Sequence, residues 1–571
     1  MAKIHTLKIK NYKGLQKFEQ IFGMADFVCL IGRGDSGKTT ILEAINAVLS
    51  PSWNLTFYDT DFYNGDINNP IEIEVSLYDL PKKLLQENKF GLYKRFLTKE
   101  GVITDNVLDD ELDERVNIIT IKLIVDKDLE PKWLVINKRE RQEPIEIRAN
   151  DRAILNVFLV SDYIDRHFSW NKGNPLYSLL KEEDGTNEKT NVLLEAFRDV
   201  KGKIDPTSFS HLDKVVKKIE TASSLLGLDI TNTNTTIDFK DISIKDGRIC
   251  LHENKVPFRL KGKGSKRLIS IAIQTELANS GGILLIDEIE QGLEPDRAQH
   301  LARTLKNQKK GQVFITTHSR DVIVELQAET IFRTKKSGES LFSFDSNLQG
   351  CLRNNPEAFF GKRVLVCEGA TEVGICRAIN EYRVSNSKSS FSNLGIVIVD
   401  GSGSSFIKYC ENFKNVDIDT CAFCDSDDKG INSKKSELRG KGVSIIDCDA
   451  NNAIEQQIFN DLCWEGIVKL IDYAIEEKTE TSIKELVKNQ LGKELPIDWK
   501  IKETNEMRVA LGKAATLKKE KANGDVIDKA LFKRIDHGIF LGETICAHLN
   551  EIKEKKLGKQ ILELTKWIDN A

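Results

Sequence analysis

Short apolar runs and alternating patterns divide the chain into two blocks that are rich in predicted strands. In the first block, "ADFVCLIG" at residues 25–32 is typical of a buried strand, and "TTILEAINAVL" at residues 39–49 has the period of a helix. Residues 71–80 and 116–125 alternate apolar and polar positions and contain many β-branched side chains, which predicts two more strands. After residue 363, short apolar strands alternate with helices, which is typical of a second, parallel α/β unit.

The segment between the two blocks has a different pattern. Residues 165–228 contain long helical patterns with charged faces, so we expect a helical insertion. Strand patterns return at residues 235–251, and the tail from about residue 480 is predicted to be helical and rich in lysine. These changes divide the chain into four predicted parts, at residues 1–164, 165–228, 229–355 and 356–571.

Composition refines this picture. With 571 residues, 40% of them hydrophobic and 30% charged, the chain can build several packed cores. It has no apolar stretch of the length that a signal peptide or membrane span needs, so we expect a cytoplasmic location and no membrane partner. The 11 scattered cysteines are expected to be reduced and mostly buried. The net charge of −4 gives no sign of nucleic-acid binding. Solvated helix faces explain the basic clusters at 253–267 and 498–534 better than a phosphate-backbone track does.

The most specific motif is "GRGDSGKT" at residues 32–39, which matches G-x-x-x-x-G-K-[ST] in full. It follows a predicted strand and opens a predicted helix, as a phosphate-binding loop does. Its glycines let backbone N–H groups surround the phosphates, Lys38 reaches the β- and γ-phosphates, and Thr39 presents a hydroxyl to Mg²⁺. We therefore expect ATP to be bound by Gly32, Arg33, Gly34, Asp35, Ser36, Gly37, Lys38, Thr39 and Thr40.

Two later strands end in residues that are suited to nucleotide hydrolysis. In "GGILLIDEIEQGLEP", four apolar residues lead to Asp287, which suits the Mg²⁺ shell, and to Glu288, which can polarise the attacking water. A further strand, "GQVFITTHS", leads to His318, where an imidazole can sense the γ-phosphate. The competing interpretation is a plain acidic strand end and a structural histidine.

Two strands of the second block also end in carboxylates. "KRVLVCEGATE" ends its strand at Glu368, and side chains at such strand ends point into the ligand crevice of a parallel sheet. "DTCAFCDSDD" ends in Asp425 and Asp427, which lie on one face of an extended chain and can share a cation. Hard oxygen ligands favour Mg²⁺ or Mn²⁺. Cys421 and Cys424 should point to opposite faces of this strand and pack in the core, since no second Cys-x-x-Cys completes a zinc site.

The order of "GRGDSGKT", "RLKGKGSKRLISIAIQTELA", "ILLIDE" and "TTHS" resembles the ABC-type ATPases that include chromosome-maintenance and DNA-repair proteins. In that group, a glycine-serine signature before a helix caps the nucleotide that the other subunit holds. The resemblance therefore implies a homodimer or higher oligomer, with a signature made of Gly262, Gly264 and Ser265. It also makes residues 165–228 a candidate dimerisation insert, and it places "EQGLEP" between the two nucleotides.

The chain departs from the ABC-type pattern at one position. The family has a glutamine that contacts the metal, but no Gln occurs between Thr39 and Gln86. Asp59 and Asp61 lie in this stretch. Either of them is the candidate replacement.

The Glu-Gly-x-x-Glu strand followed by the Asp-x-Asp strand resembles the TOPRIM domain of topoisomerases, primases and some nucleases. The resemblance implies Glu368 as the acid/base or first metal ligand, and Asp425 and Asp427 as ligands of two divalent metals. Glu372 and Glu455 are further candidate ligands. For Glu372, a carboxylate favoured by the helix dipole is an equal alternative.

An ABC-type ATPase followed by a TOPRIM domain resembles the overcoming-lysogenization-defect (OLD) family of bacterial defence nucleases, which includes Gabija-type and retron-associated proteins. The resemblance implies an ATP-regulated, metal-dependent DNA endonuclease, with a partner that is a helicase subunit or a reverse transcriptase carrying its small RNA–DNA product. "ALFKRIDHGIFLGETI" resembles the lysine-bearing segment of these nucleases, so Lys533 would stabilise charge on the scissile phosphate, unless it lies on a solvated helix. A topoisomerase or primase, and an ATP-driven clamp or sensor that does not cut, remain the alternatives.

Overall fold

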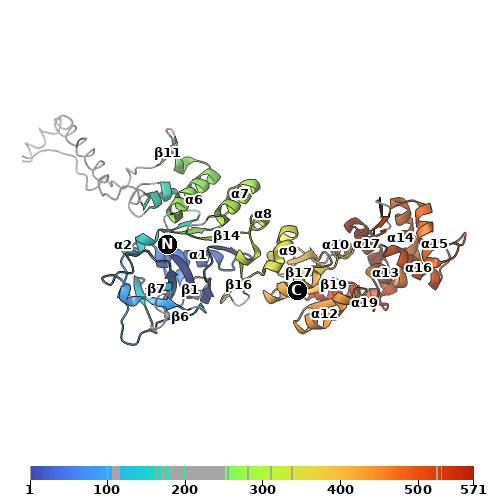
Figure 1. Ribbon diagram of the computed structural model, residues 1–571, viewed down its shortest axis with the longest axis horizontal. Coiled ribbons are helices and arrows are strands. Elements are labelled where there is room, and N and C mark those ends of the chain that lie inside the picture. Colours follow the sequence, from blue (N-terminus) through green and yellow to red (C-terminus); the bar gives the residue numbers. More distant parts are fainter. Residues whose placement is uncertain are drawn as a thin grey trace, which may run out of the picture.

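The computed structural model describes most of the chain (Figure 1). It covers residues 2–98, 101–105, 116–161, 164–168, 174–176, 178–179, 199, 251–253, 256–279, 282–308, 311–335, 338–517, 519–522, 525–528 and 530–570. Most of the predicted helical insertion at 165–228 and of the strand pattern at 235–251 lies outside the described residues. No helix in the described ranges is long and apolar enough to cross a membrane.

An eight-stranded antiparallel sheet forms one side of the N-terminal unit. Its order is β2-β1-β4-β7-β5-β6, with β8 on β7 and β9 on β8. The strands predicted at 71–80 and 116–125 are confirmed as β4 and β7, because alternate residues of both are buried against the core. The bounds are β1 (Lys3–Tyr12), β2 (Leu15–Ile21), β4 (Ile71–Tyr78), β5 (Arg95–Leu97), β6 (Ile103–Thr104), β7 (Val116–Val125), β8 (Pro131–Ile136) and β9 (Ile145–Glu146).

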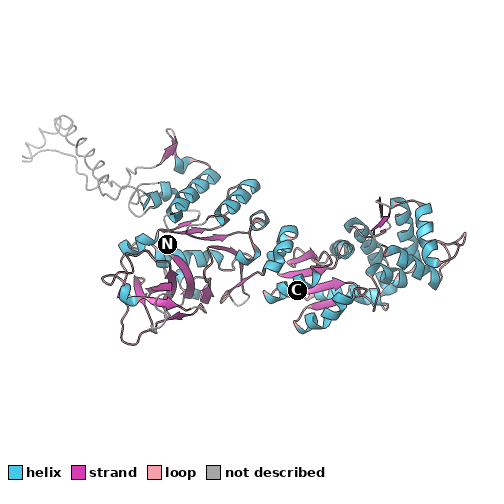
Figure 2. Ribbon diagram, in the orientation of Figure 1, coloured by secondary structure: helices cyan, strands magenta, loops and turns pink. Residues whose placement is uncertain are grey.

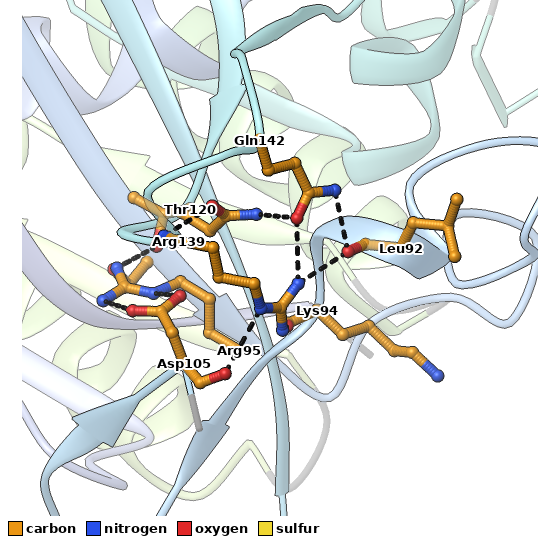
Figure 3. Close-up of polar contacts among 9 residues, drawn as sticks. Leu92, Lys94, Arg95, Asp105, Thr120, Arg139 and Gln142 are labelled. Atoms are coloured by element: carbon orange, nitrogen blue, oxygen red, sulfur yellow. Dashed lines mark hydrogen bonds and ion pairs between the residues drawn. The ribbon is translucent and has the colours of Figure 1, made fainter. Parts of the chain in front are cut away.

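A polar network holds the short strands at the edge of this sheet (Figure 3). The guanidinium of Arg95 donates to both carboxylate oxygens of Asp105, at 2.9 Å each, and to the hydroxyl of Thr120 on β7 at 3.1 Å. Arg139 donates to the carbonyls of Asp105 at 3.2 Å and Lys94 at 2.6 Å. Because Arg95 is buried, these bonds satisfy a charge that would otherwise be costly inside the protein.

The second sheet of the N-terminal unit has six strands in the order β10-β13-β14-β3-β15-β16. All neighbouring pairs are parallel except β15 with β16. Helix α1 (Lys38–Leu49) packs between the two sheets, and α6 (Lys263–Asn279) and α7 (Pro295–Lys306) contribute to the core on the other face. The strands are β3 (Phe27–Ile31), β10 (Val157–Val160), β13 (Ile283–Ile286), β14 (Gln312–Thr316), β15 (Ile331–Thr334) and β16 (Leu341–Ser343).

A four-stranded parallel sheet follows, in the order β18-β17-β19-β20 (Figure 2). It consists of β17 (Arg363–Cys367), β18 (Ile396–Asp400), β19 (Asp419–Cys424) and β20 (Ser444–Asp447), with helices α10 (Ala370–Ser385), α11 (Phe406–Asn415) and α12 (Lys429–Gly440) between them. Cys421 and Cys424 are free and buried in different core clusters. The prediction that they point to opposite faces of the strand is therefore confirmed.

The C-terminal tail is helical with one exception. Its helices are α13 (Ile454–Asp461), α14 (Trp464–Glu477), α15 (Glu480–Leu491), α16 (Asn505–Ala515), α17 (Ile535–Ala547), α18 (Leu549–Ile552) and α19 (Lys556–Asp569). The exception is a hairpin of β21 (Lys519–Ala522) and β22 (Asp525–Asp528), in a stretch that was predicted to be helical. In the sequence, Asn523 and Gly524 separate the two strands, and Asn-Gly is a favoured hairpin turn sequence. The high lysine content of the tail obscured this turn signal.

One hydrophobic core joins the N-terminal unit to the parallel unit. It contains Ile315 of β14, Leu352 of α9 (Gln349–Asn354), Val364 of β17 and Phe406 of α11, all almost fully buried. Such continuous packing transmits a displacement from one sheet to the other, because packed cores are nearly incompressible.

Glycines bring α10 and α17 into backbone contact. A Cβ atom at Gly374 would lie 2.2 Å from the carbonyl oxygen of Ile535, and one at Gly538 would lie 2.3 Å from that of Thr371. Only glycine permits this approach. The crossing fixes the first turn of α10, which carries Glu372, beside the residues that precede α17, which include Lys533.

We expect Gly538→Ala to destabilise the protein, because its methyl group would overlap the backbone of α10. Overpacking of this kind costs about 1–3 kcal/mol. Thermal unfolding followed by circular dichroism measures the effect. Gly440→Ala is the matched control, since a Cβ at that exposed position meets nothing within 4 Å. Equal unfolding temperatures for the two variants would contradict the close crossing.

Candidate functional site

Three motifs meet at the carboxyl edge of the six-stranded sheet. β3 leads into the loop at 32–37, β13 leads to Asp287 and Glu288, and β14 leads to Thr316 and His318. β14 lies between β3 and β13, and all three strands are parallel. The residues that follow these strands therefore lie together in one crevice.

The loop at 32–37 has the shape of a phosphate-binding loop. Gly32 and Gly37 have φ values of +155° and +81°, and a Cβ at Gly32 would lie 2.7 Å from Oγ of Ser36. The Nζ of Lys38 donates to the carbonyls of Gly32 at 3.1 Å and Arg33 at 3.0 Å. Burial lowers the pKa of Lys38, although Asp287 and Glu288 oppose this shift. A phosphate would supply the negative charge that this buried ammonium group needs.

Thr39 and Asp287 lie together, as ligands of one Mg²⁺ must. The hydroxyl of Thr39 donates to both carboxylate oxygens of Asp287 at 3.1 Å, across 248 residues of sequence. The hydroxyl of Thr316 donates to one of the same oxygens at 2.7 Å. This set of hard oxygen atoms fits a magnesium ion beside a bound nucleotide.

The backbone after Asp287 turns sharply and presents Glu288. Glu288 has a φ of +47°, and its N–H donates to the hydroxyl of Thr316 at 2.7 Å. Glu290, which the sequence did not single out, accepts from the hydroxyl of Thr317 and from the N–H of His318, at 2.7 Å each. Glu290 therefore fixes the backbone that carries His318. Its only sequence signal is a second acid two residues after Glu288.

Gly262, Gly264 and Ser265 lie at the start of α6, where Gly262 and Ser265 are exposed. A Cβ at Gly264 would lie 2.4 Å from the carbonyl oxygen of Gly292, so this turn packs on the loop after Glu288. Arg267 on α6 donates to the carbonyls of Asp287 and Glu288. The signature residues are thus attached to the Asp287 loop, and two of the three are exposed.

The candidate replacements for the missing glutamine lie in a short 3₁₀ turn, Asp59–Asp61. The carboxylate of Asp61 accepts from the N–H of Tyr58 at 3.0 Å and lies 4.0 Å from the Nζ of Lys13. These contacts do not include Thr39 or Asp287. A metal contact by Asp59 or Asp61 stays a prediction.

The parallel unit has its own acidic pocket at the carboxyl edge of β17 and β19. A cavity of about 610 Å³ is lined by Glu368, Glu372, Asp425, Asp427 and Lys533. Oxygen atoms of Glu368, Asp425 and Asp427 lie within 4.8 Å of one another. The structure therefore brings together residues that are up to 165 positions apart, counted from Glu368 to Lys533.

Asp425 lies at the centre of this pocket. Its N–H donates to the carboxylate of Glu368 at 3.0 Å, and its own carboxylate accepts from the N–H of Ile454 at 2.8 Å, at the start of α13. Burial, followed by the charges of Glu455 and Glu368, raises the pKa of Asp425 to about 8. A nearby cation would remove this repulsion.

Glu455 and Lys533 form an ion pair at the same pocket, which Lys533 lines. The Nζ of Lys533 lies 2.6 Å from one carboxylate oxygen of Glu455, whose side chain is fully buried. The other oxygen has no hydrogen-bond partner among the described residues. The interpretation of Lys533 as a lysine on a solvated helix therefore does not match its position, because Lys533 precedes α17, lines the acidic pocket and pairs with a buried carboxylate.

Glu372 matches both interpretations that the sequence allowed. Its carboxylate accepts from the N–H of Gly369 at 3.0 Å and so caps α10. It is also buried, and burial, followed by the charges of Asp425 and Glu455, raises its pKa well above the usual range. Glu372 is thus a cap that also faces the acidic pocket.

Two further residues, one that lines the pocket and one beside it, escaped the sequence interpretation. Lys435 is buried, and its Nζ donates to the carbonyl of Asp425 at 2.7 Å and lies 3.2 Å from the carboxylate of Asp447. Asp428 lines the cavity and caps α12 through the N–H of Ile431. The sequence offered a hint for Asp428, because this residue ends the run of acids in "CDSDD". No sequence pattern pointed to Lys435.

The carboxylates fit divalent metal ions. They supply hard oxygen atoms, one of which lacks a partner, and they repel one another strongly in the absence of a cation. Glu368, Asp425 and Asp427 would hold one ion, and Glu372 and Glu455 are the candidate ligands of a second. Lys533 lines the same pocket beside these carboxylates.

Two family models match the chain. Residues 27–325, more than half of it, match "AAA domain, putative AbiEii toxin, Type IV TA system". Residues 359–427 match "Overcoming lysogenization defect protein-like, TOPRIM domain". The chain belongs to the OLD family of ATPase–TOPRIM proteins. The fold class expected from the sequence, an ATPase domain followed by a parallel TOPRIM domain and a helical C-terminal part, is confirmed.

Individual relatives of this OLD-family chain are distant. It is 34% identical over 114 residues to a "Putative ABC transporter ATP-binding protein" of Geobacter sulfurreducens, covering 19% of the chain and 44% of that protein. It therefore spans less than half the length of this relative. It is 22% identical over 365 residues to the "DNA replication and repair protein RecF" of Phocaeicola vulgatus, covering 56% of the chain and 91% of that protein.

Two solved structures with low similarity are heads of Smc proteins. The SmcHead bound to the C-winged helix domain of ScpA has a TM-score of 0.33 at 16% identity, and the comparison covers 60% of the chain and 97% of that structure. The Smc head with an extended coiled coil from Pyrococcus furiosus also has a TM-score of 0.33, at 14% identity. This comparison covers 62% of the chain and 99% of that structure.

We expect the stability of the metal-free protein to fall as the pH rises from 3.8, the ordinary pKa of an aspartate, to about 8, the pKa of Asp425. In this window the folded chain binds more protons than the unfolded chain, so rising pH favours unfolding. Thermal unfolding with a chelator measures the slope, and added Mn²⁺ should reduce it.

Asp425→Asn should flatten this pH dependence, because the amide does not titrate. Asp498→Asn is the control, since Asp498 is an exposed carboxylate that does not line the pocket. An unchanged slope in Asp425→Asn would contradict the raised pKa.

Proposed function

We propose that this OLD-family protein is an ATP-regulated, metal-dependent DNA endonuclease. The observation that carries the proposal is the pocket in which several carboxylates and Lys533 converge at the edge of the TOPRIM sheet. A two-metal phosphodiesterase uses a metal-held water, a metal at the leaving oxygen and stabilisation of the charge on the phosphate. The residues of this pocket can supply the ligands and the cation.

Each residue of the pocket has a role in this proposal. Two divalent ions, when bound, would activate water and stabilise the leaving oxygen. Asp425 and Asp427 hold and orient the ions. Glu368 also takes or gives a proton. Burial raises the pKa of Glu368, which favours this role. Lys533, held by Glu455, stabilises negative charge on the scissile phosphate. No residue forms a covalent intermediate in this scheme.

The proposed ATP regulation rests on contacts between the two domains. A Cβ at Gly395, in the loop before β18, would lie 2.5 Å from the guanidinium of Arg33, so the phosphate-binding loop contacts the TOPRIM domain. Lys38 donates to the carbonyl of Arg33, and a bound nucleotide would compete for the same Nζ. A cavity of about 970 Å³, lined by Gly32, Arg33 and His318 on one side and Arg377 on the other, leaves room for movement. Binding of ATP would therefore shift Arg33 and, through Gly395, the TOPRIM sheet.

The assembly and the cellular setting are further parts of the proposal. Two copies would hold ATP between Lys38 of one and the signature Gly262–Gly264–Ser265 turn of the other. Membership of the OLD family supports a cytoplasmic role in anti-phage defence. In that setting the partner would be a helicase subunit, or a reverse transcriptase with its small RNA–DNA product.

We expect the purified protein to nick or cut supercoiled plasmid DNA with Mg²⁺ or Mn²⁺. Asp425→Ala should abolish cleavage, because it removes the central ligand. Lys533→Ala should slow cleavage by about 10²–10³-fold, as loss of a charge-stabilising donor does. Glu437→Gln is the control, because this carboxylate lies on the exposed face of α12 and pairs with Lys434 and Lys441.

The same assay separates the alternative functions. Relaxation without lasting nicks would indicate a topoisomerase, and synthesis of primers a primase. DNA binding without any change in the plasmid would indicate an ATP-driven clamp or sensor. Cleavage that persists in Asp425→Ala would overturn the assignment of the pocket.

We expect Gly395→Ala to weaken the response of DNA cleavage to ATP, because its methyl group would displace Arg33. The measurement is the ratio of cleavage rates with and without ATP, which should move toward one. Gly442→Ala is a matched control, since Gly442 also has a positive φ and also precedes a strand of the TOPRIM sheet, but its Cβ would contact only Lys414. Lys38→Ala should abolish the response. A normal response in Lys38→Ala would refute the coupling.

A further inference from the structure

A second group of metal-ligating side chains lies in the helical C-terminal part. Cys463 is the N-cap of α14, His548 is the C-cap of α17, and Glu551 is in α18. One ligand atom from each lies within 4.8 Å of the others, and the Nδ1 of His548 is 3.0 Å from the carboxylate of Glu551. None of the three lines the TOPRIM pocket.

The burial of His548 supports a binding site. His548 is 7% exposed, and its second ring nitrogen has no hydrogen-bond partner among the described residues. Cys463 is only partly buried, whereas the other described cysteines are buried. Its thiol is hydrogen-bonded to Glu551. An imidazole, a thiol and a carboxylate therefore already converge, with an opening to solvent on the side of Cys463 and Glu551.

We propose that Cys463, His548 and Glu551 bind one Zn²⁺ ion. Sulfur and imidazole ligands select a borderline-soft ion such as Zn²⁺, in contrast to the all-oxygen TOPRIM pocket. Zinc would bind the sulfur of Cys463, a ring nitrogen of His548 and a carboxylate oxygen of Glu551, and water would complete a tetrahedron. The thiol proton is released to solvent on binding, so affinity rises with pH.

The proposed ion would fasten the first turn of α14 to the end of α17. Helix α17 crosses α10 at Gly374 and Gly538 and begins two residues after Lys533. Zinc would thus stabilise the helices that hold Lys533 in the TOPRIM pocket, without taking part in the reaction. This role is independent of the proposed nuclease activity.

The test uses the full-length chain, stripped of metal with a chelator and titrated with Co²⁺. Thiolate ligation gives an intense near-ultraviolet charge-transfer absorption, which oxygen ligands do not give. We expect this absorption at about one Co²⁺ per chain, with displacement by Zn²⁺ and a higher unfolding temperature with Zn²⁺.

The variants make the test specific. Cys463→Ser should lose the absorption and yet remain folded, because serine is a good N-cap. His548→Ala should bind Co²⁺ at least about tenfold more weakly. Asp425→Ala is the matched control, which removes a ligand of the TOPRIM pocket and should keep the absorption.

Two outcomes would overturn the proposal. If the wild-type chain binds no Co²⁺ with thiolate absorption, the three side chains form only a hydrogen-bonded helix cap. If the absorption persists in Cys463→Ser, another cysteine is the ligand. If the wild-type chain binds zinc but does not cleave plasmid DNA, only the proposed nuclease function fails. The two proposals can therefore be refuted separately.

Discussion

Repulsion among buried carboxylates is the constraint on which the TOPRIM half of this protein depends. Asp425 and Glu372 line one pocket, with the carboxylate of Glu455 close behind them, and burial together with mutual repulsion raises the pKa of Asp425 and of Glu372. Lys533 and Lys435 offset part of this charge from inside the protein. Such an arrangement persists only because the surrounding fold is stable enough to hold it. Divalent ions would turn this repulsion into coordination.

The rest of the fold serves to hold these side chains in place. Parallel pairing of β17 and β19 brings Glu368 beside Asp425, and the start of α13 donates a hydrogen bond to the Asp425 carboxylate. The glycine crossing of α10 and α17 brings Lys533 to the same edge. The ATPase domain has a similar arrangement, because Lys38 and Asp287 lie together at the carboxyl edge of its parallel sheet. One packed core joins the two units, which would give ATP binding a physical route to the TOPRIM pocket under the proposed regulation.

Local motifs made much of the fold and of both sites predictable from the sequence. The phosphate-binding loop, the acidic end of β13 and the Asp-x-Asp strand are each defined by a few adjacent residues, and the strand at 116–125 is defined by its alternation. Lys435, Glu290 and the glycine crossing escaped because their partners are distant in sequence and no pattern marks them. The pairing of Lys533 with Glu455 likewise links residues 78 positions apart. The resemblance to OLD nucleases pointed to the lysine, and only the three-dimensional structure revealed its partner.

The central claim is that the TOPRIM pocket is a two-metal centre. The most direct test is electron paramagnetic resonance of Mn²⁺ bound to the full-length protein without nucleotide. We expect two Mn²⁺ ions per chain, at a separation of about 3.5–4 Å that couples their spins, and loss of the coupled signal in Asp425→Ala. A single uncoupled ion, or a coupled pair that survives in Asp425→Ala, would show that the pocket is not a two-metal centre.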